Sequence, residues 1–154
     1  MKYIKTFRTE ILLVILLGLV FILWARILGA EMTKRAALEN LYTTEARVNA
    51  LSYYGWEADA KSESYEIINI PSEFDEVYIE YNRLQRLSGF DLTEHRGKAA
   101  ERYTYLVTNF PADISAEVFV NILIRDFKII GGDCMTTAID GFMLPLDRRF
   151  APKI

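Results

Sequence analysis

A short stretch near the end of the chain gathers residue types that could perform chemistry. Residues 125–138 read R-D-F-K-I-I-G-G-D-C-M-T-T-A and hold the only cysteine of the chain, Cys134, next to the carboxylate of Asp133. A cysteine nucleophile needs a base, and the only histidine, His95, lies about forty residues upstream. A cell-envelope hydrolase or transferase would therefore have to use Asp133 with His95 or with Cys134.

The glycine pair in this stretch, Gly131 and Gly132, has a simpler interpretation. A phosphate-binding loop needs a glycine-rich turn that leads into a helix N-terminus, with a lysine and a hydroxyl in register. Here stretches of β composition lie on both sides of the glycines. Glycines inside a strand more often mark a bulge or a close approach of the backbone. We therefore predict that the pair shapes a sheet.

The remaining constellations are weak, and we assign no catalytic, cofactor-binding or metal-ligating residue and no cofactor. Zinc needs three or four ligands, and His95 with Cys134 would leave carboxylates to supply the rest. Asp133 and Asp140 could pair as acid and base. However, Asp140 precedes Gly141, a pattern that is typical of turns. A single cysteine also excludes an internal disulfide.

Aromatic side chains are abundant, with nine Tyr, nine Phe and two Trp. Such residues can line a ligand groove, but more often they form the core and direct their polar atoms to its rim. We favour the core for the seven most prominent ones, which are Tyr53, Tyr54, Trp56, Tyr78, Tyr81, Tyr103 and Tyr105.

Charge excludes one class of partner. The first thirty residues hold four of the 18 basic residues and one of the 21 acidic ones, which leaves 14 basic and 20 acidic residues beyond them. A region this acidic, without a long Lys/Arg run, is not expected to bind nucleic acid.

The N-terminal region predicts a membrane anchor. Residues 11–25 carry no charge, and after Arg26 the apolar run continues to Leu28. About twenty helical residues span the hydrocarbon core of a bilayer, and an arginine near the end can extend toward the head groups. A cleaved signal peptide is the alternative, but Arg26 lies where a cleavable signal prefers small uncharged residues. We expect residues 11–28 to contact the lipid bilayer in a retained single-pass anchor, with the N-terminus inside and residues 31–154 outside.

Periodicity and turn residues predict the elements that follow the anchor. Thr43 or Thr44 caps the first helix and Gly55 ends it, while Ser72 caps the second helix after Pro71. A two-residue hairpin turn is expected at 126–127, and little regular structure over 141–154. The expected elements are helices over 45–54 and 73–88 and strands over 64–70, 102–110, 117–125 and 128–136.

The predicted fold class is α+β: an N-terminal transmembrane helix followed by a small antiparallel β-sheet packed with two helices. One helix or both should cover a face of the sheet, because so small a sheet needs such cover. The predicted organisation is an N-terminal cytoplasmic tail and anchor over 1–30, a stalk or linker over 31–44, and an extracytoplasmic domain over 45–154.

A set of short motifs carries a family resemblance. They are Y-G-W-E at 54–57, I-P-S-E-F-D-E-V-Y at 70–78, Y-N-R-L-Q at 81–85, G-F-D-L at 89–92, R-G-K at 96–98, R-Y-T-Y at 102–105, I-I-G-G-D at 129–133 and D-G-F-M at 140–143. Together they resemble a family of small bacterial proteins, mainly from Gram-positive anaerobes, that carry a domain of unknown function. The resemblance implies one hydrophobic N-terminal segment and a single domain. It implies no activity, and this chain departs from it at 126–127, where a glycine turn is more usual.

We therefore expect a membrane-anchored extracytoplasmic binding or accessory domain that is not an enzyme. Its partner would be a protein, a peptide or a cell-wall component. The alternatives are the envelope hydrolase or transferase described above, and a ligand sensor that reports to a membrane signalling partner.

Overall fold

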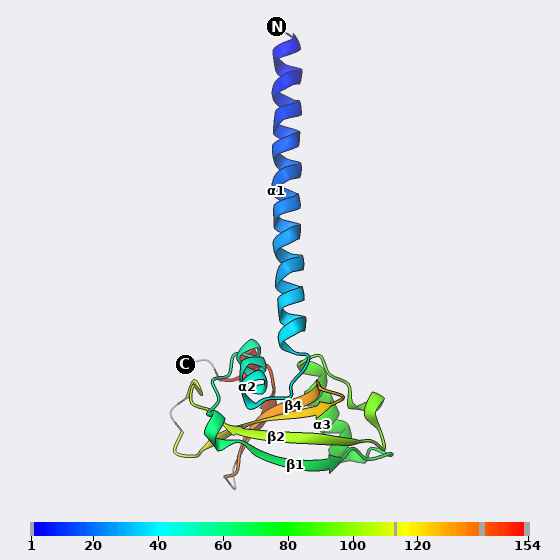
Figure 1. The fold of residues 1–154 in the computed structure, drawn as a ribbon, viewed down its shortest axis with the longest axis vertical. Helices are drawn as coiled ribbons and strands as arrows, with labels where there is room; N and C mark the ends of the chain where they lie inside the picture. Colours follow the sequence, from blue (N-terminus) through cyan, green and yellow to red (C-terminus); the bar gives the residue numbers. More distant parts are fainter. Residues whose placement is uncertain (1, 113, 139–140, 153–154) are drawn as a thin grey trace. The chain divides into compact units, whose positions relative to one another are not determined.

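The computed structural model describes residues 2–112, 114–138 and 141–152, and the side chains of these residues except those of 2–9 and 34–37. The chain divides into two compact units, Met1–Ala36 and Ala37–Ile154. Figure 1 shows the elements of both units along the sequence.

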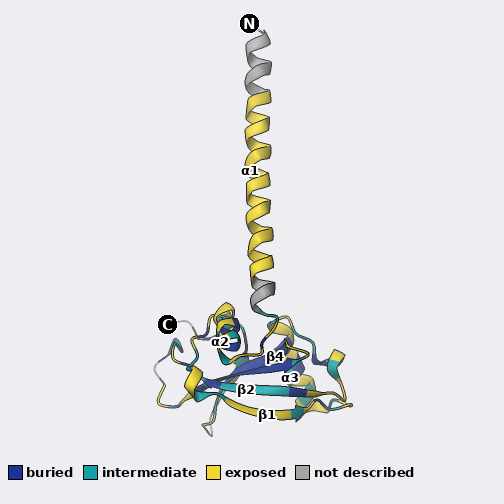
Figure 2. Cartoon of the chain, viewed as in Figure 1, coloured by how far each residue is buried: buried dark blue, intermediate teal, exposed yellow. Residues whose placement is uncertain are grey.

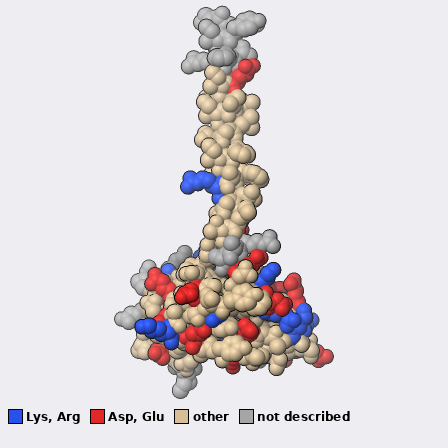
Figure 3. Space-filling view, in the orientation of Figure 1, with Lys and Arg blue, Asp and Glu red and all other residues tan. Residues whose placement is uncertain are grey.

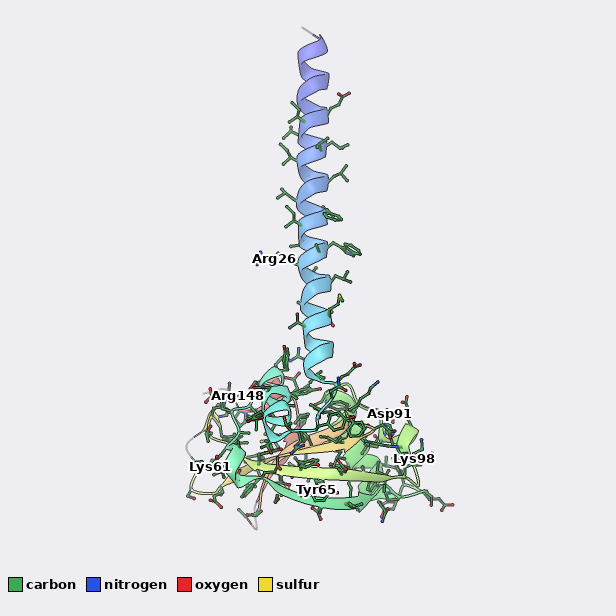
Figure 4. The ribbon with its side chains drawn as sticks, viewed as in Figure 1. Arg26, Lys61, Tyr65, Asp91, Lys98 and Arg148 are labelled. Atoms are coloured by element: carbon green, nitrogen blue, oxygen red, sulfur yellow. The ribbon has the colours of Figure 1, made fainter. Side chains whose placement is uncertain are left out.

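The first unit is a single long helix, α1 (Lys2–Ala37). Its segment Glu10–Thr33 is long and apolar enough to cross a membrane, a criterion that an N-terminal signal sequence also meets. No residue of the most apolar window is buried, and Figure 2 shows this part of the helix as exposed throughout. Arg26 points away from the helix axis, as Figure 4 shows. The helix contains the first part of the predicted stalk and ends at Ala37.

The second unit is built on a five-stranded antiparallel sheet with strand order β1-β2-β3-β4-β5. Together with its helices, the sheet confirms the α+β fold class. The strands are β1 (Ser64–Asn69), β2 (Ala99–Leu106), β3 (Val118–Arg125), β4 (Lys128–Thr136) and β5 (Met143–Pro145). The last strand corrects the expectation that the tail has little regular structure, because Met143–Pro145 pairs with Asp133–Met135 of β4.

Capping residues determine where the two helices of this unit begin. The Thr43 hydroxyl accepts a hydrogen bond from the N–H of Ala46, so α2 (Thr44–Tyr53) begins as predicted. The second helix, α3 (Glu76–Leu87), begins later than predicted. Ser72 is not its N-cap; the Asp75 carboxylate accepts the hydrogen bond from the N–H of Tyr78 at 2.8 Å.

The β3–β4 hairpin has the predicted two-residue turn without a glycine. Asp126 and Phe127 both adopt positive φ, 50° and 62°, which identifies a type I′ turn. Asp tolerates this conformation better than most residues, whereas it strains Phe. The Phe127 ring stacks on Tyr42 with 3.9 Å between ring centroids, and this contact helps to hold the strained turn.

The two helices cover opposite faces of the sheet. Val120 and Ile122 of β3 pack with Leu51 of α2 and Trp56, and we call this side the α2 face. Leu123 of β3 points the other way and packs with Leu92 and with side chains of α3, on the side that we call the α3 face. The described residues of this unit also form three short 3-10 helices: η1 (Ala60–Ser62), η2 (Leu92–His95) and η3 (Arg148–Phe150).

Candidate functional site

The glycine pair of β4 permits two close approaches to the sheet. The register shifts between Leu123 and Ile124, so Ile130 is an extra residue just before the pair. A Cβ at Gly131 would lie 2.9 Å from the side-chain oxygen of Gln85 of α3. A Cβ at Gly132 would lie on the opposite face, only 2.5 Å from the backbone oxygen of Asn121.

The N–H of Gly132 donates a hydrogen bond of 2.6 Å to the Oε1 of Gln85. Gln85 is fully buried. The glycine pair is therefore part of the packing between α3 and the sheet, which is the role that its position in a strand predicted.

Cys134 and Asp133 are neighbours in sequence but lie on opposite faces of the sheet. Cys134 packs in the α2-face core with Val120 and Ile122. Burial raises the pKa of the Cys134 thiol to about 12, and the nearby Asp133 acts in the same direction. A thiol that stays protonated is a poor nucleophile. Because the two side chains lie on opposite faces of the sheet, the structure does not bring the Cys134 thiol and the Asp133 carboxylate together.

His95 lies at the end of η2, near the β3–β4 hairpin. Burial lowers its pKa, and Lys98 and Arg125 act in the same direction. Asp133 faces Asn121, which is four residues along β3 from Arg125, a separation of about 13 Å along a strand. His95 is thus placed at the hairpin end of the sheet, away from Asp133.

The alternative pair of Asp133 with Asp140 is not tested, because Asp140 lies outside the described residues. Among the residues that the structure describes, no group of three or more His, Cys, Asp or Glu side chains is arranged to hold a metal ion.

Asp133 instead belongs to a chain of side-chain hydrogen bonds that crosses the α3 face. The Thr104 hydroxyl of β2 donates to the Oδ1 of Asn121 at 2.5 Å, and the Nδ2 of Asn121 donates to Asp133 at 2.7 Å. The Tyr81 hydroxyl of α3 donates to the other carboxylate oxygen of Asp133 at 2.9 Å. Both Asp133 oxygens are therefore satisfied, and the chain ties α3 to three strands.

Burial raises the pKa of Asp133, while its two hydrogen bonds and the charge of Arg102 act to lower it. Burial also raises the pKa of Tyr81, and the adjacent carboxylate adds to this shift. Asp133 and Asn121 are both buried. A closed and satisfied network of this kind stabilises a unique packing and offers no open position for a substrate.

A second buried network lies on the α2 face, around Arg47. Its guanidinium forms an ion pair with Glu63 at 2.9 Å and donates to the Tyr105 hydroxyl at 2.8 Å. It also donates to the backbone oxygens of Leu41 and Tyr42 and lies 3.9 Å from the centroid of the Tyr103 ring. Arg47 therefore holds the incoming segment, residues 38–42, against the sheet.

The two aromatic residues of β2 do not open a deep pocket. Tyr105 is fully buried, and its hydroxyl donates to Glu63. Tyr103 is half-buried between Arg47 and Tyr65, whose ring centroid is 5.1 Å from its own. The core interpretation holds for Tyr105, while Tyr103 and Tyr65 continue the aromatic layer out to the edge strand.

An open groove lies at the hairpin end of the sheet, and we call it the hairpin groove. Its volume is about 320 Å³. It is lined by Ile67, Ala99, Ala100, Glu101, Ile124, Arg125, Asp126 and Phe127. The lining combines an apolar surface with charges of both signs. Figure 3 shows that acidic and basic side chains are also interspersed on the visible face of the domain.

Exposed aromatic and aliphatic side chains extend the hairpin groove at both ends. At one end Phe127 and Tyr42 stack on each other, and both are exposed. At the other end Ile67 and Tyr65 of β1 are exposed. Figure 2 shows β1 as mostly exposed and β4 as mostly buried, and Figure 4 labels Tyr65 on β1.

Sequence reasoning missed both the groove and the polar chain. The groove joins residues of β1, β2 and the hairpin turn, which meet only through strand register. Asn121 carried a signal, since it interrupts the apolar run V-F-V-N-I-L-I of β3. Such a signal identifies the hydrogen-bonded chain only when the pairing of the strands is already known.

Comparisons with known proteins gave one result. A family model described as a domain of unknown function, DUF4830, matches residues 50–134, which is more than half of the chain. The matched region runs from within α2 into β4. This match bears out the resemblance to a domain of unknown function that the sequence motifs carried. No curated protein and no solved structure matched the chain.

Proposed function

The chain belongs to the DUF4830 family of domains of unknown function, and from its own features we propose that it is a bacterial membrane-anchored binding domain. The domain would lie outside the cytoplasmic membrane and recognise a protein or peptide partner through the hairpin groove. It would act by binding and not by catalysis.

The N-terminal helix supports the anchored location. The segment Glu10–Thr33 has the length and composition of a membrane span. Three basic residues lie on each side of the apolar run: Lys2, Lys5 and Arg8 before it, and Arg26, Lys34 and Arg35 after it. The later three are diluted by Glu31 and Glu39, so the N-terminal side is the one favoured for the cytoplasm. In this arrangement residues 11–28 contact lipid, the chain crosses the bilayer once, and the domain lies on the extracytoplasmic side.

The hairpin groove is the single observation that carries the binding proposal. Its walls present Ile67 and Phe127, which are exposed although they are large and apolar. Exposed apolar surface that is rimmed by charged groups is typical of interaction sites. The opposite charges of Glu101 and Arg125 at the same groove suit a partner that has both apolar and polar groups, as a polypeptide has.

The enzymatic alternative receives less support. It would require Asp133 to work with His95 or Cys134, and these groups lie at separate places on the sheet. The Asp133 oxygens are already occupied by Tyr81 and Asn121. A catalytic role would need this network to open, whereas a binding role for the groove leaves it intact.

The proposal is tested with a photo-reactive phenylalanine analogue in place of Phe127, in the full-length protein expressed in bacterial membranes. The same analogue at Val77, an exposed position on α3, is the matched control. We expect a discrete cross-linked species from position 127 and none of that mass from position 77. The species should be lost when Glu101→Arg changes the charge at the groove.

Identical products from both positions, or no product from position 127, would contradict binding at the groove. A substrate whose turnover disappears in the Cys134→Ala or Asp133→Asn protein would favour the enzymatic alternative. A cross-link to cell-wall glycan in place of a polypeptide would keep the site but change the class of partner.

A further inference from the structure

Strand β1 has an outer edge to which no described residue of the chain pairs. It is the first strand in the sheet order, and only β2 lies beside it. Its two largest exposed side chains are those of Tyr65, which is 52% exposed, and Ile67, which is 65% exposed. An edge strand of this kind is a template for another strand.

The backbone direction along β1 follows from its C-terminal end. The N–H of Ile70 donates to the Lys98 oxygen at 3.0 Å, and the Ile70 oxygen accepts from Gly97 at 3.0 Å. Both backbone groups of Ile70 therefore point toward the β2 side. Because this direction alternates along a strand, the backbone groups of Tyr65, Ile67 and Asn69 point to the open edge.

The usual devices that block such an edge are absent from β1. Its sequence S-Y-E-I-I-N contains no lysine and no proline, and its pairing with β2 has no register shift. The one charged residue, Glu66, is engaged by Arg102 of the neighbouring strand. The edge is thus regular, apolar in part and free of local repulsion.

We propose that this edge pairs with the same edge of a second copy of the chain, antiparallel and centred on Ile67. In this register Ile67 faces its own counterpart, and Tyr65 faces Asn69 of the other copy. On the α3 face Glu66 lies opposite Ile68, so that no two like charges meet. The pairing uses the backbone N–H and C=O groups of Tyr65, Ile67 and Asn69, which point to the open edge of β1.

The membrane anchor favours a second copy of the chain as the partner of the β1 edge. It also favours antiparallel over parallel pairing of the two β1 strands. The two-fold axis of an antiparallel edge pair is perpendicular to the sheet, so both copies present the α2 face on the same side. The incoming segment packs on that face, since Leu41 is part of its core. Both copies then receive their chains from one side, as two anchors in one bilayer require. Parallel pairing about a two-fold axis would turn one copy over.

The interface itself is small, because β1 has only six residues. Stable complexes between free proteins bury on the order of 1,600 Å², more than one such strand pair provides. Confinement of both anchors to one membrane raises the effective concentration and allows a weak contact to form. We therefore expect pairing in bilayers.

Cysteine cross-linking of the full-length protein in lipid vesicles tests the register. In the proposed pair the two Ile67 Cα atoms lie about 5.5 Å apart, within disulfide range. Ile67→Cys should give a disulfide-linked dimer with copper phenanthroline and oxygen. Tyr65→Cys mixed with Asn69→Cys should do the same, whereas Tyr65→Cys alone should not, because its thiols would be about 13 Å apart. Native Cys134 is buried, and Val77→Cys is the exposed control.

A charge exchange provides the second test. Because residue 67 faces itself, Ile67→Lys and Ile67→Glu should each abolish association, and a mixture of the two should restore it. Unchanged Trp56 fluorescence would show that each variant is folded. Equal cross-linking at positions 67 and 77, or no restoration in the mixture, would overturn the proposal. Because Ile67 also lines the hairpin groove, the groove test is read from Phe127 in the chain with native Ile67, so that each proposal can fail without the other.

Discussion

The side-chain oxygen of Gln85 in α3 lies 2.6 Å from the backbone nitrogen of Gly132 in β4. This hydrogen bond requires α3 to lie very close to the sheet, and Gly131 provides the space because it has no Cβ. On the other face Gly132 lies so close to Asn121 and Leu146 that a side chain would collide with them. The two glycines therefore bring two layers of the domain into contact with one strand.

Substitution of Gly132 by valine should destabilise the domain by about 3 kcal/mol or more, because the new Cβ would meet backbone that cannot move aside. Urea unfolding of the full chain in detergent, followed by the fluorescence of the buried Trp56, measures the effect. Val77→Ala, at an exposed position, should change the unfolding free energy by less than about 0.5 kcal/mol. Equal midpoints for Gly132→Val and the native chain would contradict this packing.

Loss of the buried Arg47 should be among the most damaging changes, since it leaves the partly buried Glu63 without its cation. We expect Arg47→Met to cost about 3–5 kcal/mol. The double variant with Glu63→Gln should recover part of this loss, because the uncompensated charge is then removed. A double-mutant cycle of unfolding free energies from urea measures the coupling between the two residues. If the effects of the two substitutions simply add, the ion pair contributes no coupling and the prediction is wrong.

The same network predicts a dependence of stability on pH. Burial acts to raise the pKa of Glu63, but hydrogen bonds from Tyr105 and Arg47 outweigh it and hold the pKa below its ordinary value of 4.5. A carboxyl with a lowered folded pKa stabilises the fold above its unfolded pKa, and this contribution is lost as the pH falls through the folded value. The unfolding free energy should therefore fall below about pH 4.5. The decline should be shallower in Glu63→Gln.

Asp133 should affect the pH dependence of the unfolding free energy in the opposite direction. Because burial raises its folded pKa, its contribution is full at low pH and declines as the pH rises through the folded value. Asp133→Asn should remove this decline, and it should alter the unfolding free energy at neutral pH by less than about 1.5 kcal/mol, since an amide can still bond to Tyr81 and Asn121. Unfolding measured between pH 4 and 8 tests this expectation. A pH dependence identical to that of the native chain would contradict it.

Cys134 should not react with thiol reagents in the folded protein. Its side chain is buried, and burial raises its pKa to about 12, so both access and thiolate formation are suppressed. Ellman's reagent at pH 8 should titrate the thiol only after denaturation. Rapid modification of the native protein would show that the thiol is accessible and would reopen the question of a nucleophile.

Local sequence signals predicted the elements well where short-range chemistry decides them. Thr43 caps α2, Gly55 follows its end with positive φ, and the hairpin turns at Asp126 and Phe127. These features depend on residues a few positions apart. The predicted start of α3 was wrong because Ser72 and Asp75 are both residue types that cap helices well. The local sequence does not show which of the two caps the helix in the packed domain.

Features that depend on register could not be predicted in the same way. Strand β5 forms because the β4 edge is available to it, and the sequence of a three-residue strand carries little signal. The hairpin groove and the Asp133 network each join residues of several strands. Their members are distant in sequence, so the separate motifs did not reveal them.

The location of the domain is the claim on which the proposed function rests, and a labelled cysteine tests it directly. In the full-length Val77→Cys protein the new thiol is exposed, whereas Cys134 is buried. A membrane-impermeant maleimide applied to intact bacterial cells should label this protein as fully as it does after permeabilisation, and the labelled protein should sediment with the membranes. Labelling that appears only after the cells are opened, or a labelled protein in the soluble fraction, would contradict a membrane-anchored domain outside the cell.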